Sequence, residues 1–185
     1  NIVLPQNFNS PFKATSIIDF WQRWHITLTQ FLNNFIYNPL LRSLKSINFL
    51  NSMIITFFVF LIAGIWHGSS WNFVLFGAFH GLGLIVNHLY KKYFNLNISK
   101  YIFWFLTFNY VNISFIFFRT KEIDNVIIII KKMFDINFFF NDYLLTDKFF
   151  IKFIDDFNLF ICFLLSIIIC IFFKNSYVLL KNNDK

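Results

Sequence analysis

The sequence predicts an all-α, polytopic membrane protein, and three observations support this fold class. Hydrophobic residues occupy 57% of the 185 positions and charged residues only 14%, which is more apolar than a soluble domain. The apolar residues gather in four long runs, each close to the roughly 20 residues with which a helix crosses a bilayer. Short polar segments separate these runs and carry many of the Lys and Arg residues. We therefore expect an interfacial or re-entrant helical segment before about four transmembrane helices.

Residues 1–48 form the segment that precedes the apolar runs. Ser16 followed by Asp19 predicts a capped helix start, and Asp19 and Arg23 are spaced for an ion pair one turn apart. Pro39 is expected to end this helix. Large apolar residues recur along it at a helical period: Trp21, Trp24, Leu28, Phe31 and Phe35. The pattern predicts one amphipathic helix that lies in the membrane interface or dips into it.

Four apolar stretches predict the transmembrane helices: residues 51–66, 71–90, 101–118 and 157–173. The first stretch is short, and Gly64 is expected to break it inside the membrane. By the positive-inside rule, the Lys and Arg residues that flank these stretches place the link from His67 to Ser70 away from the cytoplasm. The segment 119–156 then lies on the same outer side, and "EIDNVIIIIKKMF" within it predicts a helix that lies on the surface or packs on the bundle.

Charge and cysteine content exclude some function classes. The net charge of +7 is spread over short polar segments without a basic stripe, so it indicates membrane-surface and topology charge and no nucleic-acid partner. Cys162 and Cys170 share one predicted helix and lie about 12 Å apart along its axis, so they cannot form a disulfide with each other. No Met opens the chain and no cleavable signal precedes Pro5, so we expect these residues to begin partway through a longer protein.

His67 stands between two apolar runs and has two interpretations. It is a histidine in an interfacial turn, with Ser69 or Ser70 capping the next helix, or it is an imidazole held toward a cavity. Gly64 and Gly68 favour the second interpretation, because glycines let backbones approach closely and permit a tight turn.

The other histidines also have structural alternatives. His80 lies near the middle of the second apolar run, where it either hydrogen-bonds to a neighbouring helix or serves function. His25 either anchors the segment at the lipid headgroups or takes part in chemistry. His88 lies beside Lys91 at the end of a run and is interpreted as ordinary.

The histidine spacing disfavours a metal site. No two histidines are three or four residues apart, and no Cys or carboxylate stands near His67, so we expect no bound metal. The chain also has no Gly-rich phosphate loop and no G-x-S-x-G nucleophile motif. The hypothesis that is left is a histidine general base inside a membrane chamber.

Three stretches carry ordered motifs: "LPQNFNSPFKATSIIDFWQRWHITLTQFL", "FLIAGIWHGSSWNFVLFGAFHGLGL" and "VNISFIFFRTKEIDNVIIIIKKMF". In this order they resemble the later half of the membrane-bound O-acyltransferases. The resemblance covers residues 4–134 and is nearest to the bacterial branch with the alginate O-acetylation membrane protein, the peptidoglycan O-acetyltransferase and the lipoteichoic acid D-alanyl transferase. It implies that residues 1–185 are the C-terminal part of one such membrane domain, with transmembrane helices in residues 49–174.

The resemblance also implies roles for single residues. The histidine of the family's W-H-G motif is its essential catalytic residue and falls on His67, and a second polar position falls on His25. The histidine of the F-H-G element falls on His80, and the resemblance does not assign its role. We expect four residues to bind substrate or line the chamber: Trp24, Trp66, Asn72 and His80. Where the branch usually has an Arg-Asp pair and "YIPLGG", this chain has Asn33, Asn34 and "YNPLLRS".

The implied mechanism is general-base catalysis of acyl transfer. An imidazole with an ordinary pKa of about 6.5 removes the proton of a hydroxyl that attacks a thioester, which contributes about 100- to 10,000-fold. His67 is the expected base, while His25 orients it, donates to the oxyanion or positions a substrate. The implied donor is acyl-CoA, most simply acetyl-CoA, with no bound cofactor. The implied acceptor is an envelope polysaccharide, reached through an extracytoplasmic acyltransferase or esterase-like partner of this bacterial inner-membrane, multi-pass protein.

Two other function classes stay open. A catalytically inactive scaffold for a partner acyltransferase would keep the helices and tolerate loss of His67, and the absent Arg-Asp pair favours it. A transporter is disfavoured, because the third and fourth apolar runs carry mainly Asn109, Asn112 and Ser114 as polar residues and no intramembrane acid.

Overall fold

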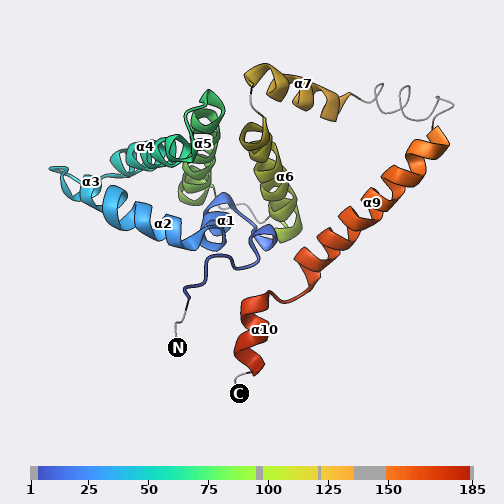
Figure 1. Cartoon of the computed structure of the whole chain (residues 1–185). Coiled ribbons are helices and arrows are strands. Elements are labelled where there is room, and N and C mark those ends of the chain that lie inside the picture. Colours follow the sequence, from blue (N-terminus) through green and yellow to red (C-terminus); the bar gives the residue numbers. More distant parts are fainter. Residues whose placement is uncertain (1–3, 95–97, 121, 136–148, 184–185) are drawn as a thin grey trace. The chain divides into compact units, whose positions relative to one another are not determined.

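The computed structural model describes residues 4–94, 98–120, 122–135 and 149–183. Every regular element in these ranges is helical, so the predicted all-α class is confirmed. The chain divides into two compact units, Asn1–Ile123 and Asp124–Lys185. The first unit (Figure 1) contains, in order, η1 (Pro11–Lys13), α1 (Ile17–Arg23), α2 (Ile26–Leu32), η2 (Asn33–Tyr37), α3 (Asn38–Arg42), α4 (Phe49–His67), α5 (Trp71–Tyr93) and α6 (Lys100–Arg119).

The first predicted helix starts as expected but is interrupted. The Ser16 hydroxyl accepts a hydrogen bond from the Asp19 backbone N–H at 3.0 Å, and Arg23 Nε lies 2.6 Å from Asp19 Oδ1, so the cap and the ion pair are confirmed. The prediction of one continuous helix is wrong. Helix α1 ends at Arg23, Trp24 is extended, and the helix resumes only at Ile26.

Pro39 does not end the second helical stretch, which continues to Arg42. The turn η2 before it is a π turn, and this wider turn relieves the clash of a proline ring with the carbonyl one turn earlier. The interruption and the π turn also divide the predicted apolar stripe between different faces. Trp21 and Leu28 are buried, whereas Phe31 and Phe35 are exposed.

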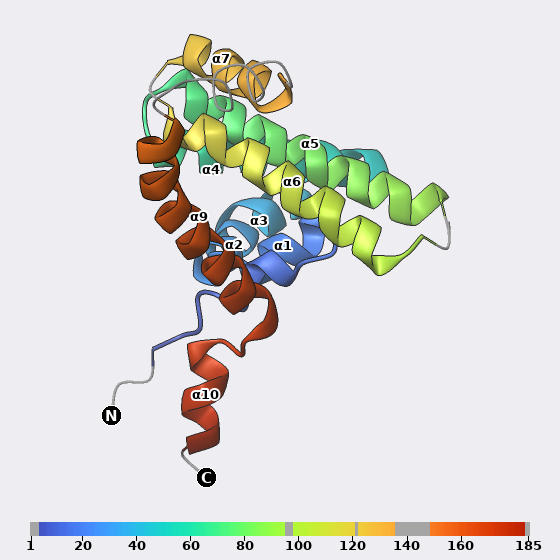
Figure 2. The same cartoon turned by 90° about the vertical axis from the view of Figure 1, so that its right-hand side faces the viewer.

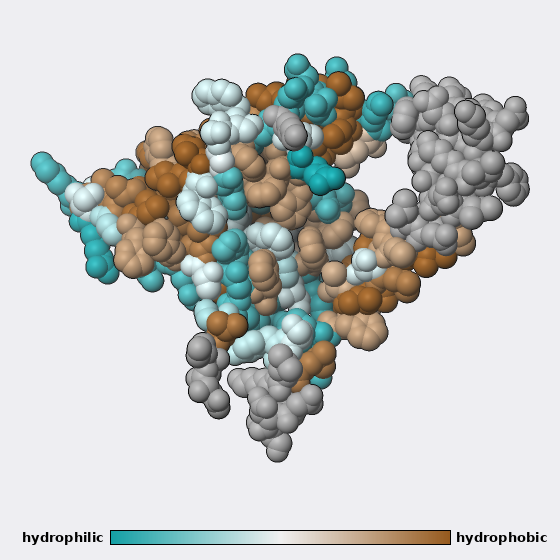
Figure 3. Space-filling view, in the orientation of Figure 1, coloured by the Kyte–Doolittle hydropathy of each residue, from teal (hydrophilic) through white to brown (hydrophobic). Residues whose placement is uncertain are grey.

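Helices α4, α5 and α6 are each long and apolar enough to cross a membrane, which confirms a polytopic helical fragment. Each begins after a polar cap, because the side chains of Asn48, Ser70 and Ser99 accept hydrogen bonds from backbone N–H groups of the first turn. Many large apolar side chains on their outer faces are exposed, as Figure 3 shows by the hydrophobic surface over α2 to α4. Such a surface suits lipid contact.

Helices α4 and α5 form a close hairpin, and they lie side by side in Figures 1 and 2. Gly64 does not break α4, which continues through it to His67. Instead Gly64 faces Gly77 of α5, where an added Cβ would overlap backbone atoms of the opposite helix: at Gly77 the Phe60 carbonyl oxygen and at Gly64 the Phe73 carbonyl oxygen. The predicted close approach of backbones is therefore confirmed at Gly64, whereas the atoms nearest to an added Cβ at Gly68 belong to the Phe73 side chain.

Helix α6 and the N-terminal segment complete the first unit, with α6 running alongside α5 (Figure 2). The indole Nε1–H of Trp104 donates to the Phe12 carbonyl at 2.8 Å, and Asn87 Oδ1 accepts from the Ile18 backbone N–H at 3.3 Å. Buried apolar side chains from α1, α4, α5 and α6 form the core between them: Ile17, Phe20, Trp21, Phe60, Leu84 and Val111.

The second unit contains α7, which starts at the boundary (Ile123–Phe134), α9 (Phe149–Phe172) and α10 (Ser176–Asn183). Helix α7 confirms a helix at "IDNVIIIIKKMF". The described apolar part of α9, Ile161–Phe172, is shorter than a membrane crossing, so the fourth span at 157–173 stays a prediction. Residues 121 and 136–148 of the predicted surface segment lie outside the described residues. Cys162 and Cys170 are both free, as their spacing predicts.

Candidate active site

His25 occupies the interruption between α1 and α2 and has an unusual backbone. Its φ of 45° and ψ of 54° lie in the left-handed region, which is sterically costly for a residue with a Cβ. The preceding Trp24 is extended, so the chain changes direction over these two residues. Non-glycine residues in this region concentrate at functional sites, because the surrounding structure must hold them there.

The His25 imidazole lies among aromatic rings. The Trp66 ring meets it edge-on, with the ring centroids 6.4 Å apart, and the Phe8 ring centroid lies 6.2 Å away. Its Nδ1 atom is buried and has no hydrogen-bond partner among the described residues. A buried nitrogen without a partner costs free energy, so this atom is suited to receive a ligand group.

His67 ends α4 and lies close to His25. Its ring centroid is 4.9 Å from that of Trp66 and 5.1 Å from that of Phe118, both in edge-on geometry. The imidazoles of His67 and His25 both lie against the Trp66 ring. Trp66, which is 63% exposed, therefore contacts both imidazoles, and the structure brings these three predicted site residues together.

Trp24 forms an aromatic wall beside this cluster. Its indole stacks on Phe20 at a centroid distance of 5.7 Å and meets Phe8 edge-on at 5.0 Å. It also contacts Phe115 of α6 at 5.5 Å. The ring is thus fixed from α1, α6 and the N-terminal segment, and Phe8 links it to His25.

His80 is fully buried, with both ring nitrogens hydrogen-bonded. Its Nδ1 accepts from Trp21 Nε1–H at 3.2 Å, and its Nε2 lies 2.8 Å from Ser114 Oγ. The Ser114 hydroxyl donates to the Val111 carbonyl at 2.6 Å, so His80 Nε2 carries a hydrogen and donates to Ser114. The network joins α1, α5 and α6, and the sequence signal for it was Ser114, a small polar residue in an apolar run.

Asn72 is almost fully buried in the first turn of α5. Its Nδ2 donates to the Thr120 carbonyl at 2.8 Å and lies 3.2 Å from Thr120 Oγ1, which ties the start of α5 to the end of α6. Its Oδ1 is buried without a hydrogen-bond partner in the described part of the chain. No hydrogen bond of Asn72 to His25 or His67 is found in the described part of the chain, so the structure does not join Asn72 to the cluster of His25, Trp66 and His67.

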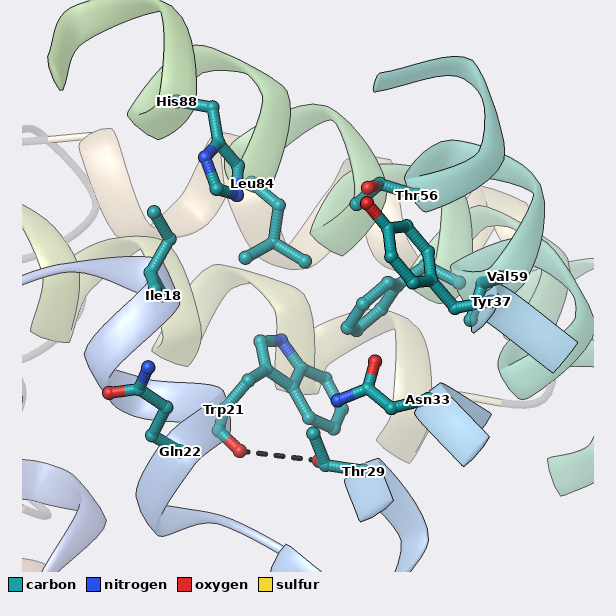
Figure 4. Close-up of a pocket in the computed structure, with 11 residues that line it drawn as sticks. Ile18, Trp21, Gln22, Thr29, Asn33, Tyr37, Thr56, Val59, Leu84 and His88 are labelled. Atoms are coloured by element: carbon teal, nitrogen blue, oxygen red, sulfur yellow. Dashed lines mark hydrogen bonds between the residues drawn. The ribbon is translucent and has the colours of Figure 1, made fainter. Parts of the chain in front are cut away.

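A pocket of about 190 Å³ lies between α1, α2, η2, α4 and α5 (Figure 4). Hydroxyl, amide and imidazole groups share its wall with apolar side chains: Ile18, Trp21, Gln22, Thr29, Asn33, Tyr37, Thr56, Val59, Phe60, Leu84 and His88. Figure 4 shows the Trp21 indole at its centre and the hydrogen bond from Thr29 Oγ1 to the Trp21 carbonyl, 3.2 Å long. His88, which the sequence left as ordinary, is one of the wall residues.

Metal ligands do not gather in the described part of the chain, where no three His, Cys, Asp or Glu side chains converge. The polar residues of α6 also have local partners. Asn109 Nδ2 and Asn112 Nδ2 each donate to a carbonyl one turn earlier in the same helix, at 2.8 Å.

Comparison with known proteins agrees with the motifs around His25 and His67. The family model described as membrane-bound O-acyltransferase (MBOAT) matches residues 1–121, which include both histidines. The chain belongs to this family. The resemblance predicted from the sequence is thereby confirmed, and the family accounts for several apolar helices in a multi-pass membrane protein.

Relatives within the MBOAT family include enzymes of envelope polymers. The chain is 41% identical over 141 residues to the peptidoglycan O-acetyltransferase of Helicobacter pylori, covering 74% of this chain and 26% of that protein. It is 31% identical over 148 residues to a probable alginate O-acetylase of Pseudomonas syringae pv. tomato, covering 77% and 26%. It is 30% identical over 136 residues to a teichoic acid D-alanyltransferase of Streptococcus thermophilus, covering 62% and 32%. The chain thus spans about a quarter to a third of the length of these relatives.

Proposed function

We propose that this chain carries the acyl-transfer centre of a membrane O-acyltransferase that moves acetyl from a thioester donor to a hydroxyl. The observation that carries the proposal is the cluster of His25, Trp66 and His67, in which a partly accessible imidazole lies near a second imidazole with an unpartnered, buried Nδ1. Membership of the MBOAT family and the names of the relatives support this reaction class.

In the proposed reaction His67 is the general base. It accepts the proton of the acceptor hydroxyl while the hydroxyl oxygen bonds to the thioester carbonyl carbon. The carbon–sulfur bond then breaks, and the leaving thiolate takes the proton back from the imidazolium. An ester and a free thiol leave the site, and base assistance of this kind contributes about 10² to 10⁴-fold.

His25 is proposed to act on the same substrates through Nδ1. Because this nitrogen is buried and lacks a partner among the described residues, a substrate oxygen bound there would complete its hydrogen bonding. A donor at this position would favour the negative charge that develops on the carbonyl oxygen. The left-handed backbone of His25 holds the imidazole beside Trp66 for this role.

The pocket of Figure 4 is the proposed site for the amide-bearing arm of an acyl-CoA donor. Its wall offers neutral hydroxyl and amide groups and no charged side chain, which suits a neutral polar chain. Three turns of α4 separate Thr56 in this wall from His67, which is about 16 Å along the helix axis.

The proposed orientation puts the pocket side of α4 and α5 at the cytoplasmic face of the bacterial inner membrane. Lys91 and Lys92 at the end of α5 and Arg42 before α4 support it. With Cys162 and Cys170 replaced by Ser, a Ser70→Cys variant should react with a membrane-impermeant thiol reagent from outside, whereas Ser46→Cys should not. Labelling of Ser46→Cys alone would indicate the opposite orientation.

The proposed acceptor is an envelope polysaccharide, reached directly or through an extracytoplasmic acyltransferase or esterase-like partner. The test uses cells that lack the full-length protein, complemented with the wild type or with His67→Ala. We expect base-labile acetyl on the envelope polysaccharide to return with the wild type only, at equal protein abundance in the membrane. Full acetylation with His67→Ala would refute the enzyme and favour the inactive scaffold.

A further inference from the structure

The N-terminal loop holds the turn at Trp24 and His25 from both sides. Before the turn, the Asn9 backbone N–H donates to the Arg23 carbonyl at 2.9 Å. After the turn, the Asn7 carbonyl accepts from the Ile26 N–H at 2.9 Å. The Asn7 side chain continues this contact, since its Oδ1 accepts from the Thr27 N–H at 3.1 Å and from the Thr27 hydroxyl at 2.9 Å.

These hydrogen bonds replace an ordinary helix cap. The first N–H groups of a helix need acceptors, and the residue just before the helix usually supplies one from its side chain. At α2 that residue is His25, which makes no side-chain cap bond. Asn7, 20 residues before Thr27, supplies two acceptors instead, so the His25 imidazole is not used for capping.

The same contacts counter the strain of the left-handed residue. A non-glycine residue in this conformation is sterically strained and persists only where neighbouring contacts hold it. Here the contacts of Asn9 and Asn7 enclose the turn and leave only Trp24 and His25 between them. Without the Asn7 acceptors, α2 could start one residue earlier with His25 in the helical region, which would turn the imidazole away from Trp66.

We propose that Asn7 is the positioning residue for His25. The carbonyl oxygen and Oδ1 of Asn7 cap α2 in place of the His25 side chain. They thereby keep the His25 backbone left-handed and its imidazole beside Trp66 and His67. The inference rests on the proposed function, because it assigns Asn7 a role through a residue of the proposed site. Asn7 itself touches the backbone and hydroxyl next to His25 and no reacting atom.

The experiment measures acyl transfer per folded protein for the full-length enzyme in membranes, with radiolabelled acetyl-CoA as the probe. Asn7→Ala should lower turnover by about 10²-fold, which is the usual effect of a misplacement of about 1 Å. Asn7→Asp should restore most of it, because a carboxylate oxygen accepts the same two bonds and a negative charge suits a helix start. Asn48→Ala is the matched control, since Asn48 caps α4 through a 2.8 Å bond to the Asn51 N–H, and it should leave turnover unchanged.

A double variant separates positioning from a general loss of structure. If Asn7 acts through His25, Asn7→Ala should cost no further turnover in a His25→Ala background. Full additivity of the two losses, or normal turnover of Asn7→Ala where His25→Ala is impaired, would overturn the inference and leave the proposed function intact. Normal turnover of His25→Ala would instead refute the part of the proposed function that this inference uses.

Thr27→Val covers the case in which Asn7→Ala is lost from the membrane. This variant removes only the hydroxyl that donates to Asn7 Oδ1 and keeps the backbone bond. A fall in turnover at normal abundance would support the positioning role. Unchanged turnover would count against it.

Discussion

His80 and His25 lie in the same helical unit, but their ring nitrogens differ in whether they have hydrogen-bond partners. Both nitrogens of His80 have partners on two other helices, and its side chain is fully buried. The Nδ1 of His25 is buried with no partner among the described residues, and its backbone is strained. A satisfied network makes a structure rigid, whereas a buried nitrogen without a partner at a strained residue is a group to which a ligand can bind, as proposed for His25.

The histidines of the two family motifs also differ in their surroundings. His67, in "WHG", lies near His25 through the Trp66 ring, while His80, in "FHG", is enclosed by Trp21 and Ser114. Phe76 contacts both, with its ring centroid 6.0 Å from His67 and 4.6 Å from His80. The two histidines therefore have different surroundings despite similar motifs, which is why the proposal gives His67 the chemistry and His80 the packing that holds α1 in place.

The largest effect is expected for His67→Gln. Glutamine keeps a polar side chain at the end of α4 but has no basicity, so acetyl transfer should fall by about 10² to 10⁴-fold. Abundance and thermal stability in detergent should stay near the wild-type values, because His67 is partly exposed at a helix end. Radiolabelled acetyl transfer and heat-resolved size exclusion on the same membranes measure both. If His67→Gln retained acetyl transfer, His67 would not be the general base, and the proposed difference in role between His67 and His80 would be wrong.

The next effect is expected for His80→Leu, and it should appear in stability. Leucine fills the space but leaves the buried Trp21 Nε1–H without its acceptor, which costs about 1–3 kcal/mol. Ser114→Ala leaves the buried His80 Nε2–H without its acceptor but keeps the bond from Trp21, so its loss of stability should be smaller than that of His80→Leu, which breaks both bonds. The melting temperature in detergent measures this order. If turnover per folded protein fell by several powers of ten while stability held, His80 would belong with His67.

Sequence reasoning succeeded where the signal was local. The caps at Ser16 and Ser70 and the pair of Asp19 with Arg23 depend on residues within one helical turn, and all three are present. The apolar runs that predicted α4, α5 and α6 are also local, since a helix that faces lipid must be apolar along its own length.

The geometry at His25 could not be predicted because it depends on distant residues. A helical period continues in the sequence across Trp24 and His25, and only the contacts of Asn7 reveal the interruption. The partner of His80 is 34 residues away at Ser114, and the sequence offered several polar residues in that run without a way to choose among them. Motifs in the sequence identified the histidines of interest. The packing of α1 and α6 determines which of their ring nitrogens have hydrogen-bond partners among the described residues.

The smallest effect, and the sharpest test of the His25 side of the comparison, is the difference between two substitutions at His25. Asparagine tolerates the left-handed backbone better than other residues with a Cβ and keeps a polar group, whereas alanine keeps neither advantage. If His25 gives one hydrogen bond to the substrate, His25→Asn should exceed His25→Ala in turnover by about fivefold, since such a bond contributes about 1 kcal/mol and 1.36 kcal/mol equals a factor of ten. Both variants should reach similar abundance, because the Asn7 contacts that hold the turn involve no atom of the imidazole. Acetyl transfer per folded protein, measured for the two variants in parallel, decides the matter. Equal turnover of the two at the wild-type level would mean that the unpartnered Nδ1 serves no substrate, and His25 would then join His80 as a residue of the packing.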